Sequence, residues 1–209
     1  MIRTTEKKER SLGVKLSRKG ERSSSPKAAL IRKPYRPGQH GKRFKNKVSE
    51  YGQQLQEKQK IKFSYGVTER QLLRLFKEVE KKSKSEHISA ATAAIDSLER
   101  RLDNVIMRLG FTEGRNLARQ MVSHGHFRVN GKKVKIPSYK VKVGDKVSVR
   151  PESKSMAYFQ ELPEKLKKFE PPVWLKIEKS QVEGEVVGHP KDTDVPFNVS
   201  LVVDFYSKK

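Results

Sequence analysis

The chain has 209 residues, of which 34% are apolar, and it carries a formal net charge of +23 at pH 7. No apolar run approaches the ~18 residues of a membrane-spanning helix, and the start MIRTTEKKER lacks the apolar region of a secretory signal peptide. Without cysteine there is no disulfide framework and no thiolate zinc site. These features favour one or two domains of a protein outside the membrane, and they are compatible with a reducing cytoplasm.

The positive charge is concentrated in two stretches of the chain. Residues 1–47 hold 16 basic and 3 acidic side chains, and residues 97–150 hold 13 and 4, whereas the remaining residues are almost balanced with 18 and 17. Solubility alone would be served by interspersed charges of both signs. The two basic stretches therefore indicate a nucleic-acid partner. An anionic membrane surface is the alternative, but no basic amphipathic helix with an aromatic-rich face supports it.

Residues 1–47 are too polar to predict an independently folded domain, and no helical or strand period persists in them. We expect a basic arm that is largely extended. Residues 48–96 predict a small helical domain. Its first helix is capped by Ser49 and ends at Tyr65-Gly66, and Thr68 with Gln71 forms a capping box for a second helix.

Residues 97–150 predict a module of two short helices and a small antiparallel sheet. Asp96 is the expected N-cap of the first helix, which ends at Gly110, and Thr112 is the expected N-cap of the second, which ends at Gly125. Helical spacing predicts a stripe rich in hydrogen-bond donors on the second helix. The stripe consists of Arg115, Asn116, Arg119, Gln120, Ser123 and His124.

A hairpin is predicted after the second helix, because Asn130-Gly131 is a two-residue turn signal. The turn pairs Val129 with Lys132 and sets Arg128 directly against Lys133. It leaves Phe127, Val129, Val134 and Ile136 on an apolar face. Like charges directly opposite one another destabilise a sheet, so the pair favours a polyanionic partner, although lysines that splay into water would also explain it.

The last segment, residues 151–209, is expected to pack on the body of the protein. A short helix is predicted from Ser155 to Leu162, ended by Pro163, with Met156 and Phe159 facing inward. Short strands are expected around Val182 to Val187. Leu201 to Phe205 fits a strand or a terminal helix equally well.

Several motifs in order resemble the family of small-subunit ribosomal protein four. They include PGQHGKR at 37–43, SEYGQQLQEKQKIKFSYGVTERQ at 49–71, RLDNVIMRLGFTEGRNLARQMVSHGHFRVNGKKVKIPSY at 101–139, WLKI, EGEVV and VVDFYSKK. The resemblance implies an α+β protein whose middle part is an αL-type RNA-binding module. Many relatives bind zinc through four cysteines, and those positions align with Glu6, Glu9, Ser23 and Ala28 here. The chain therefore resembles the zinc-free form, with no metal and no cofactor.

The resemblance implies a structural protein of the small ribosomal subunit that binds 16S ribosomal RNA early in assembly. It also implies a position beside the channel through which mRNA enters, where Arg43, Lys45 and Lys47 meet the message and contribute to translational accuracy. The small-subunit proteins three and five are the implied neighbours. The implied location is the cytoplasmic ribosome, with an organellar ribosome left open.

Combining the charge pattern with the resemblance gives a set of candidate RNA-binding residues. They are Arg36, Gln39, His40, Lys42, Arg43, Lys45, Lys47, Arg115, Asn116, Arg119, Gln120, Ser123, His124, His126, Arg128, Asn130, Lys132 and Lys133. We find no catalytic constellation in the sequence, and His124 with His126 lacks a third metal ligand nearby. An RNA-modifying enzyme or a ribosome-rescue factor with the same RNA-binding module is the alternative, but only 59 residues follow Arg150.

Overall fold

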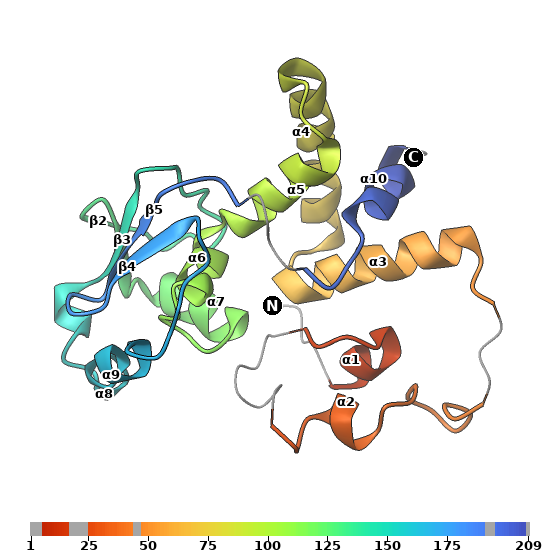
Figure 1. The fold of residues 1–209 in the computed structure, drawn as a ribbon, viewed down its shortest axis with the longest axis horizontal. Helices are drawn as coiled ribbons and strands as arrows, with labels where there is room; N and C mark the ends of the chain where they lie inside the picture. The colour runs from red at the N-terminus through yellow and green to blue at the C-terminus, as the bar shows by residue number, and fades with distance from the viewer. Residues whose placement is uncertain (1–5, 17–24, 44–46, 191–194, 208–209) are drawn as a thin grey trace. The chain divides into compact units, whose positions relative to one another are not determined.

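The computed structural model describes residues 6–16, 25–43, 47–190 and 195–207. The chain forms two compact units (Figure 1): a helical unit, residues 1–95 with 194–209, and a sheet unit, residues 96–193. The sheet unit contains an antiparallel five-stranded sheet, so the predicted α+β class is confirmed. Within the described residues, no helix is both long enough and apolar enough to cross a bilayer.

The described part of the N-terminal segment contains two short helices where we expected extended chain. They are α1 (Glu6–Leu12) and α2 (Ala29–Arg32). The buried carboxylate of Glu9 accepts a hydrogen bond from the backbone N–H of Leu16 at 3.4 Å, and Leu16 is 1% exposed. A few such contacts fix a segment whose composition alone gives no helical period.

Helix α3 (Glu50–Tyr65) begins and ends where the sequence predicts, and α4 (Glu69–Glu86) begins where it predicts. The Ser49 side chain accepts from the backbone N–H of Gly52, and Gly66 ends α3 in the left-handed conformation at φ 65°. Thr68 and Gln71 form the predicted capping box, with both reciprocal hydrogen bonds present. Local capping chemistry therefore determines these boundaries.

The C-terminal residues form a helix, α10 (Val199–Ser207), which packs on α3 in the helical unit (Figure 1). The rings of Tyr51 and Phe205 lie 5.8 Å apart, and those of Phe76 and Tyr206 stack at 4.9 Å. Of the two alternatives for Leu201 to Phe205, the helix is correct. These aromatic contacts, far apart in sequence, hold the helical unit together.

Glu69, the first residue of α4, links the two ends of the helical unit. Its carboxylate lies 2.8 Å from Nζ of Lys58 and 3.0 Å from Nζ of Lys62, and it accepts from the hydroxyl of Tyr206 at 3.0 Å. Partial burial opposes ionisation, but these hydrogen bonds prevail and lower the pKa of Glu69 to about 2.

The predicted start of the next helix is wrong. Asp96 lies inside α5 (Ala90–Glu99), and the chain breaks at residues 100–101 before α6 (Leu102–Arg108). The first N–H groups of α6 donate to backbone oxygens of a distant loop, Leu102 to Tyr139 at 2.9 Å and Asp103 to Pro137 at 3.1 Å. Because these acceptors come from tertiary structure, the local sequence did not reveal the break.

Helix α7 (Arg115–His124) begins two residues later than predicted. Its N-cap is Gly114, which makes no side-chain cap, while Thr112 is buried at 3% exposure. Gly125 ends α7 at φ 80°, as expected. Packing of the neighbouring Phe111 against Phe127, with ring centroids 6.2 Å apart, buries the residues before α7.

The sheet has the strand order β2-β1-β3-β5-β4. The strands are β1 (Phe127–Val129), β2 (Lys132–Lys133), β3 (Lys146–Val149), β4 (Leu175–Glu178) and β5 (Glu183–Val186). The predicted register is confirmed, with Arg128 opposite Lys133 and Val129 opposite Lys132. Asn130 and Gly131 have φ values of 49° and 76°, both positive, as a type I′ turn requires.

One face of the sheet contributes to the core together with α6 and α7. Phe127, Val147 and Val149 pack in one cluster with Leu102 and Ile106, all at most 2% exposed. The prediction that Ile136 lies on the apolar face is wrong, because its side chain is 60% exposed. The strand β2 ends at Lys133, so the alternation that would carry Ile136 inward is not maintained.

The segment after β3 joins the sheet unit through a 3₁₀ turn, Pro151–Ser153, and two short helices, α8 (Ala157–Gln160) and α9 (Leu162–Leu166). Phe159 and Leu162 are buried as predicted. Pro163 does not end a helix but occupies the first turn of α9, where its missing N–H costs nothing. Met156, expected to face inward, is 43% exposed.

Candidate nucleic-acid interface

The first group of candidate residues lies on the N-terminal segment of the helical unit. Gln39, His40, Lys42, Arg43 and Lys47 are exposed, and Arg36 is partly buried. Lys45 lies outside the described residues, as does Ser23 of the positions aligned with zinc ligands. The exposed members are accessible to a partner.

Arg10 organises the turn that carries these residues, and sequence reasoning missed it. Its Nε donates to the backbone oxygens of Lys33 at 3.0 Å and Tyr35 at 3.1 Å, and its Nη2 donates to that of Arg36 at 3.3 Å. The guanidinium also lies 4.9 Å from the centre of the Tyr35 ring. An arginine among scattered apolar residues gives no sequence signal for such a role.

The turn itself requires glycine at position 41. A Cβ added to Gly41 would collide with the backbone oxygen and carbon of Arg36, so no other residue fits without moving the chain. Lys42 next to it lies over the Tyr35 ring, with Nζ 5.4 Å from the ring centre. The PGQHG motif thus fixes a compact turn that presents basic side chains.

The second group lies on the hairpin of the sheet unit. Arg128 on β1 faces Lys133 on β2 in register, and Glu152 lies 3.5 Å from Nη2 of Arg128 and 2.7 Å from Nε of Arg150. Hydrogen bonding from Arg150 lowers the pKa of the Glu152 carboxyl. We call Arg128, Lys133, Lys135 and Arg150, with His124 and His126, the hairpin patch.

In the hairpin patch, burial and neighbouring positive charges shift the pKa values of two side chains. Loss of solvation, followed by repulsion from Arg150 and Lys135, lowers the pKa of Lys133. Partial burial, followed by the charges of His124, Arg150 and Lys133, lowers the pKa of His126. Protonation of Lys133 and His126 is therefore disfavoured in the free protein, and a bound anion would favour it.

Arg150 and Lys135 belong to this patch but were absent from the predicted set. Arg150 follows β3, and its backbone N–H donates to the backbone oxygen of His126 at 2.8 Å. Strands β1 and β3 pair with Phe127 opposite Val149, and this pairing brings Arg150 next to His126. The sequence carries no signal for this non-local pairing.

Two candidate residues have structural roles. Asn130 donates to Asp145 Oδ1 at 2.8 Å and accepts from the backbone N–H of Lys146 at 2.9 Å, which ties the turn to β3. Nδ1 of His126 lies 2.9 Å from Oγ of Ser153. Lys132 beside the turn is exposed.

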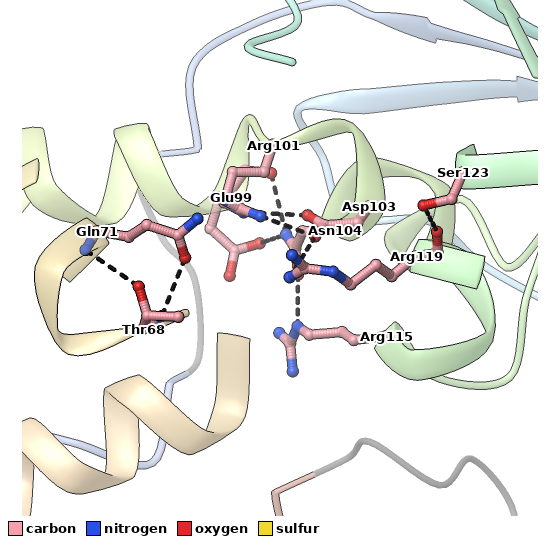
Figure 2. Close-up of polar contacts among 9 residues, drawn as sticks. All are labelled: Thr68, Gln71, Glu99, Arg101, Asp103, Asn104, Arg115, Arg119 and Ser123. Atoms are coloured by element: carbon pink, nitrogen blue, oxygen red, sulfur yellow. Dashed lines mark hydrogen bonds and ion pairs between the residues drawn. The ribbon is translucent and has the colours of Figure 1, made fainter. Parts of the chain in front are cut away.

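Members of the stripe on α7 contact polar groups of the protein itself, as Figure 2 shows. Nε of Arg115 donates to Oδ1 of Asn104 at 2.7 Å, and Nη1 of Arg119 lies 3.9 Å from Oδ2 of Asp103. Ser123 donates its hydroxyl to the backbone oxygen of Arg119 at 2.9 Å. Gln120 and His124 are exposed, and Asn116 is partly buried.

Behind the stripe lies a buried polar network. Glu99, 0% exposed, accepts from Arg108 Nε at 2.9 Å and Nη2 at 3.0 Å, and from Asn104 Nδ2 at 2.7 Å. Arg101 donates to both oxygens of Asp103, Nε to Oδ1 at 3.1 Å and Nη2 to Oδ2 at 2.9 Å. Two buried carboxylates therefore set the geometry of the arginines around α6 and α7.

The described residues contain no group of three or more His, Cys, Asp or Glu that could hold a metal ion. The rings of His124 and His126 lie 6.0 Å apart, and Glu9 is engaged with Leu16. Side chains that can donate to phosphate, rather than metal ligands, dominate both candidate regions.

Two family models match successive parts of the chain. Residues 1–93 match the family described as ribosomal protein S4/S9 N-terminal domain, and residues 100–147 match the S4 domain. The chain is 48% identical over 198 residues to the small ribosomal subunit protein uS4 of Caldicellulosiruptor bescii, covering 94% of this chain and 93% of that protein. The chain is 44% identical to the uS4 protein of Roseiflexus castenholzii, over 95% of this chain and 94% of that protein. It is 46% identical to the uS4 protein of Halothermothrix orenii, over 94% of this chain and 93% of that protein.

Proposed function

The chain belongs to the family of small ribosomal subunit protein uS4, and from this premise we propose that it is a structural component of the small ribosomal subunit that binds 16S ribosomal RNA. It would do so through the hairpin patch and α7 of the sheet unit and through the basic turn of the helical unit. The family consists of ribosomal proteins and not of enzymes.

The observation that carries the proposal is the opposition of Arg128 and Lys133 across the hairpin, in register, beside Arg150. Like charges facing one another on a sheet cost stability. Phosphates of RNA would remove that cost, and A-form RNA is recognised largely by its backbone and shape. The hairpin patch combines arginine forks with lysine point charges, the two residue types that bind phosphate.

Finer aspects of the proposal rest on the resemblance and on exposure. Arg43 and Lys47 are exposed and are proposed to meet mRNA at the channel through which it enters, and with Lys45 to contribute to translational accuracy. Early binding of 16S ribosomal RNA would help small-subunit assembly begin. Proteins three and five of the small subunit are the proposed neighbours, in the cytoplasm.

An RNA-modifying enzyme or rescue factor would use the same module together with a different partner domain. The family match disfavours this alternative, because the uS4 relatives are matched over 93–94% of their own lengths and by both parts of the chain.

The test measures binding of the full chain to a transcript of 16S ribosomal RNA at several salt concentrations. Each neutralised phosphate should contribute about 0.7 to 0.9 to the slope of log affinity against log salt. Lys133→Ala should reduce both affinity and slope. Lys176→Ala is the matched control, because Lys176 is an exposed lysine of the same unit, set opposite Glu185 on the sheet.

An affinity that does not change with salt would refute a mechanism based on phosphate contacts. Equal losses for Lys133→Ala and Lys176→Ala would show that net charge, and not the hairpin patch, determines binding.

A further inference from the structure

Glu152 places a carboxylate between two arginines of the hairpin patch. It lies in the 3₁₀ turn Pro151–Ser153 that follows β3, and its side chain is 56% exposed. Its Oε2 accepts a hydrogen bond from Nε of Arg150 at 2.7 Å and lies 3.5 Å from Nη2 of Arg128, which is a looser ion pair. A single carboxylate oxygen therefore contacts both guanidinium groups.

The surroundings of this oxygen are those that a phosphate prefers. Arg128 on β1 lies directly opposite Lys133 on β2, and the charge of Glu152 opposes the shift that Arg150 and Arg128 impose on the pKa of Lys133. Guanidinium and ammonium groups donate to phosphate oxygens as they do to carboxylate oxygens. A phosphate placed where the carboxylate of Glu152 lies would therefore meet the same donors.

The exposure of Glu152 makes its contacts easy to exchange. Exposed ion pairs contribute little to stability, so an incoming anion replaces them at little cost. Glu99 is the contrasting case, because it is 0% exposed and accepts from two nitrogens of Arg108. A carboxylate that stayed between the arginines of the hairpin patch would also repel the phosphates of an approaching RNA.

We infer that Glu152 is an internal competitor of RNA: in the free protein its carboxylate occupies a phosphate position between Arg150 and Arg128, and a phosphate of the bound RNA displaces it. This inference rests on the proposed function and deepens it, since it locates one phosphate contact and names the group that competes for it. The competition weakens binding of any polyanion that brings no phosphate to this position, so Glu152 contributes to specificity.

The test compares the affinities of full-length variants for a 16S ribosomal RNA transcript. Glu152→Gln removes the competing charge and keeps the size of the side chain, so it should bind about two- to fivefold more tightly, the range expected from the strength of an exposed ion pair. Glu178→Gln is the matched control, because it makes the same change of charge at an exposed glutamate of β4. Three strand spacings of about 4.8 Å separate β4 from β1, more than the screening length of about 10 Å, so the control should hardly change affinity.

A double-mutant cycle with Arg150 shows whether the gain comes from the contact itself. Arg150→Ala removes the shorter of the two contacts of Glu152 and should weaken binding. Residues in direct contact couple, so Glu152→Gln should improve affinity clearly less in Arg150→Ala than in the natural chain. Glu152→Ala, which also removes the charge, is the second variant and should bind more tightly as Glu152→Gln does.

The outcomes separate the inference from the proposed function. Unchanged or weaker binding by Glu152→Gln would show that the carboxylate does not compete with RNA. Equal gains in Glu152→Gln and Glu178→Gln, or equal gains with and without Arg150, would show a general effect of net charge. Each of these results overturns the inference while the RNA-binding function stands, whereas failure of the natural chain to bind the transcript would overturn both.

Discussion

Replacing Glu99 should strongly destabilise the sheet unit. Glu99 is 0% exposed and accepts hydrogen bonds from Arg108 at 2.9 and 3.0 Å and from Asn104 at 2.7 Å. Glu99→Ala removes the negative charge that binds two nitrogens of Arg108, whose side chain is 23% exposed. Removing one partner of a buried ion pair costs about 3 to 5 kcal/mol, and we expect about 3 kcal/mol because Arg108 retains some access to water.

Trp174 provides a selective probe, because it is the only tryptophan of the chain and lies 7% exposed in the core of the sheet unit. Urea unfolding of the full chain followed by Trp174 fluorescence therefore reports on this unit. With a slope of about 1 to 2 kcal/mol per molar urea, a loss of about 3 kcal/mol lowers the midpoint by about 1.5 to 3 M.

Glu161→Ala is the matched control. Glu161 is also a glutamate of the sheet unit paired with a cation, lying 3.4 Å from Lys165, but its side chain is 68% exposed. Exposed pairs of this kind contribute about 0.3 to 0.5 kcal/mol, so its midpoint should hardly move. If Glu99→Ala and Glu161→Ala lower the midpoint equally, burial does not give the Glu99 pair the importance we assign to it.

Three further predictions concern acid stability, core packing and RNA binding. The pKa of Glu69 is lowered to about 2 from 4.5, so its contribution to stability is complete above pH 4.5 and is lost as the pH falls toward about 2. Thermal unfolding followed by circular dichroism should show this loss of stability, and the loss should be smaller in Glu69→Gln. Gly184→Ala should destabilise the sheet unit by about 1 to 3 kcal/mol in urea unfolding, because the added Cβ would lie 2.5 Å from both methyl groups of the buried Leu109. Gly188→Ala is the control and should be nearly neutral, because a Cβ at position 188 would meet nothing within 4 Å. RNA affinity should rise as the pH falls below 6.5, because a bound phosphate favours the protonated form of His126, which the lowered pKa disfavours in the free protein. If the affinities of the natural chain and of His126→Gln change with pH in parallel, this imidazole has no role in binding.

The sequence by itself determined the features that depend on neighbouring residues. The caps at Ser49 and Thr68, the αL glycines Gly66 and Gly125, and the Asn130-Gly131 turn all lie where predicted. Each depends on backbone conformation and on hydrogen bonds within a few residues, so the local sequence contains the necessary information. The two basic regions follow in the same way from the sequence alone, whereas the α+β class was implied by the family resemblance.

Only the tertiary structure decided where α6 begins and which contacts hold the arginines of the candidate site. The first N–H groups of α6 use backbone oxygens of Pro137 and Tyr139, and Arg115 is bound to Asn104, which lies eleven positions earlier in the chain. In both cases the partner comes from another element, so no local pattern announces it. The chain alone therefore identified basic side chains that could meet RNA, whereas the fold decided which of them are held in a fixed orientation, because orientation requires partners that only packing brings together.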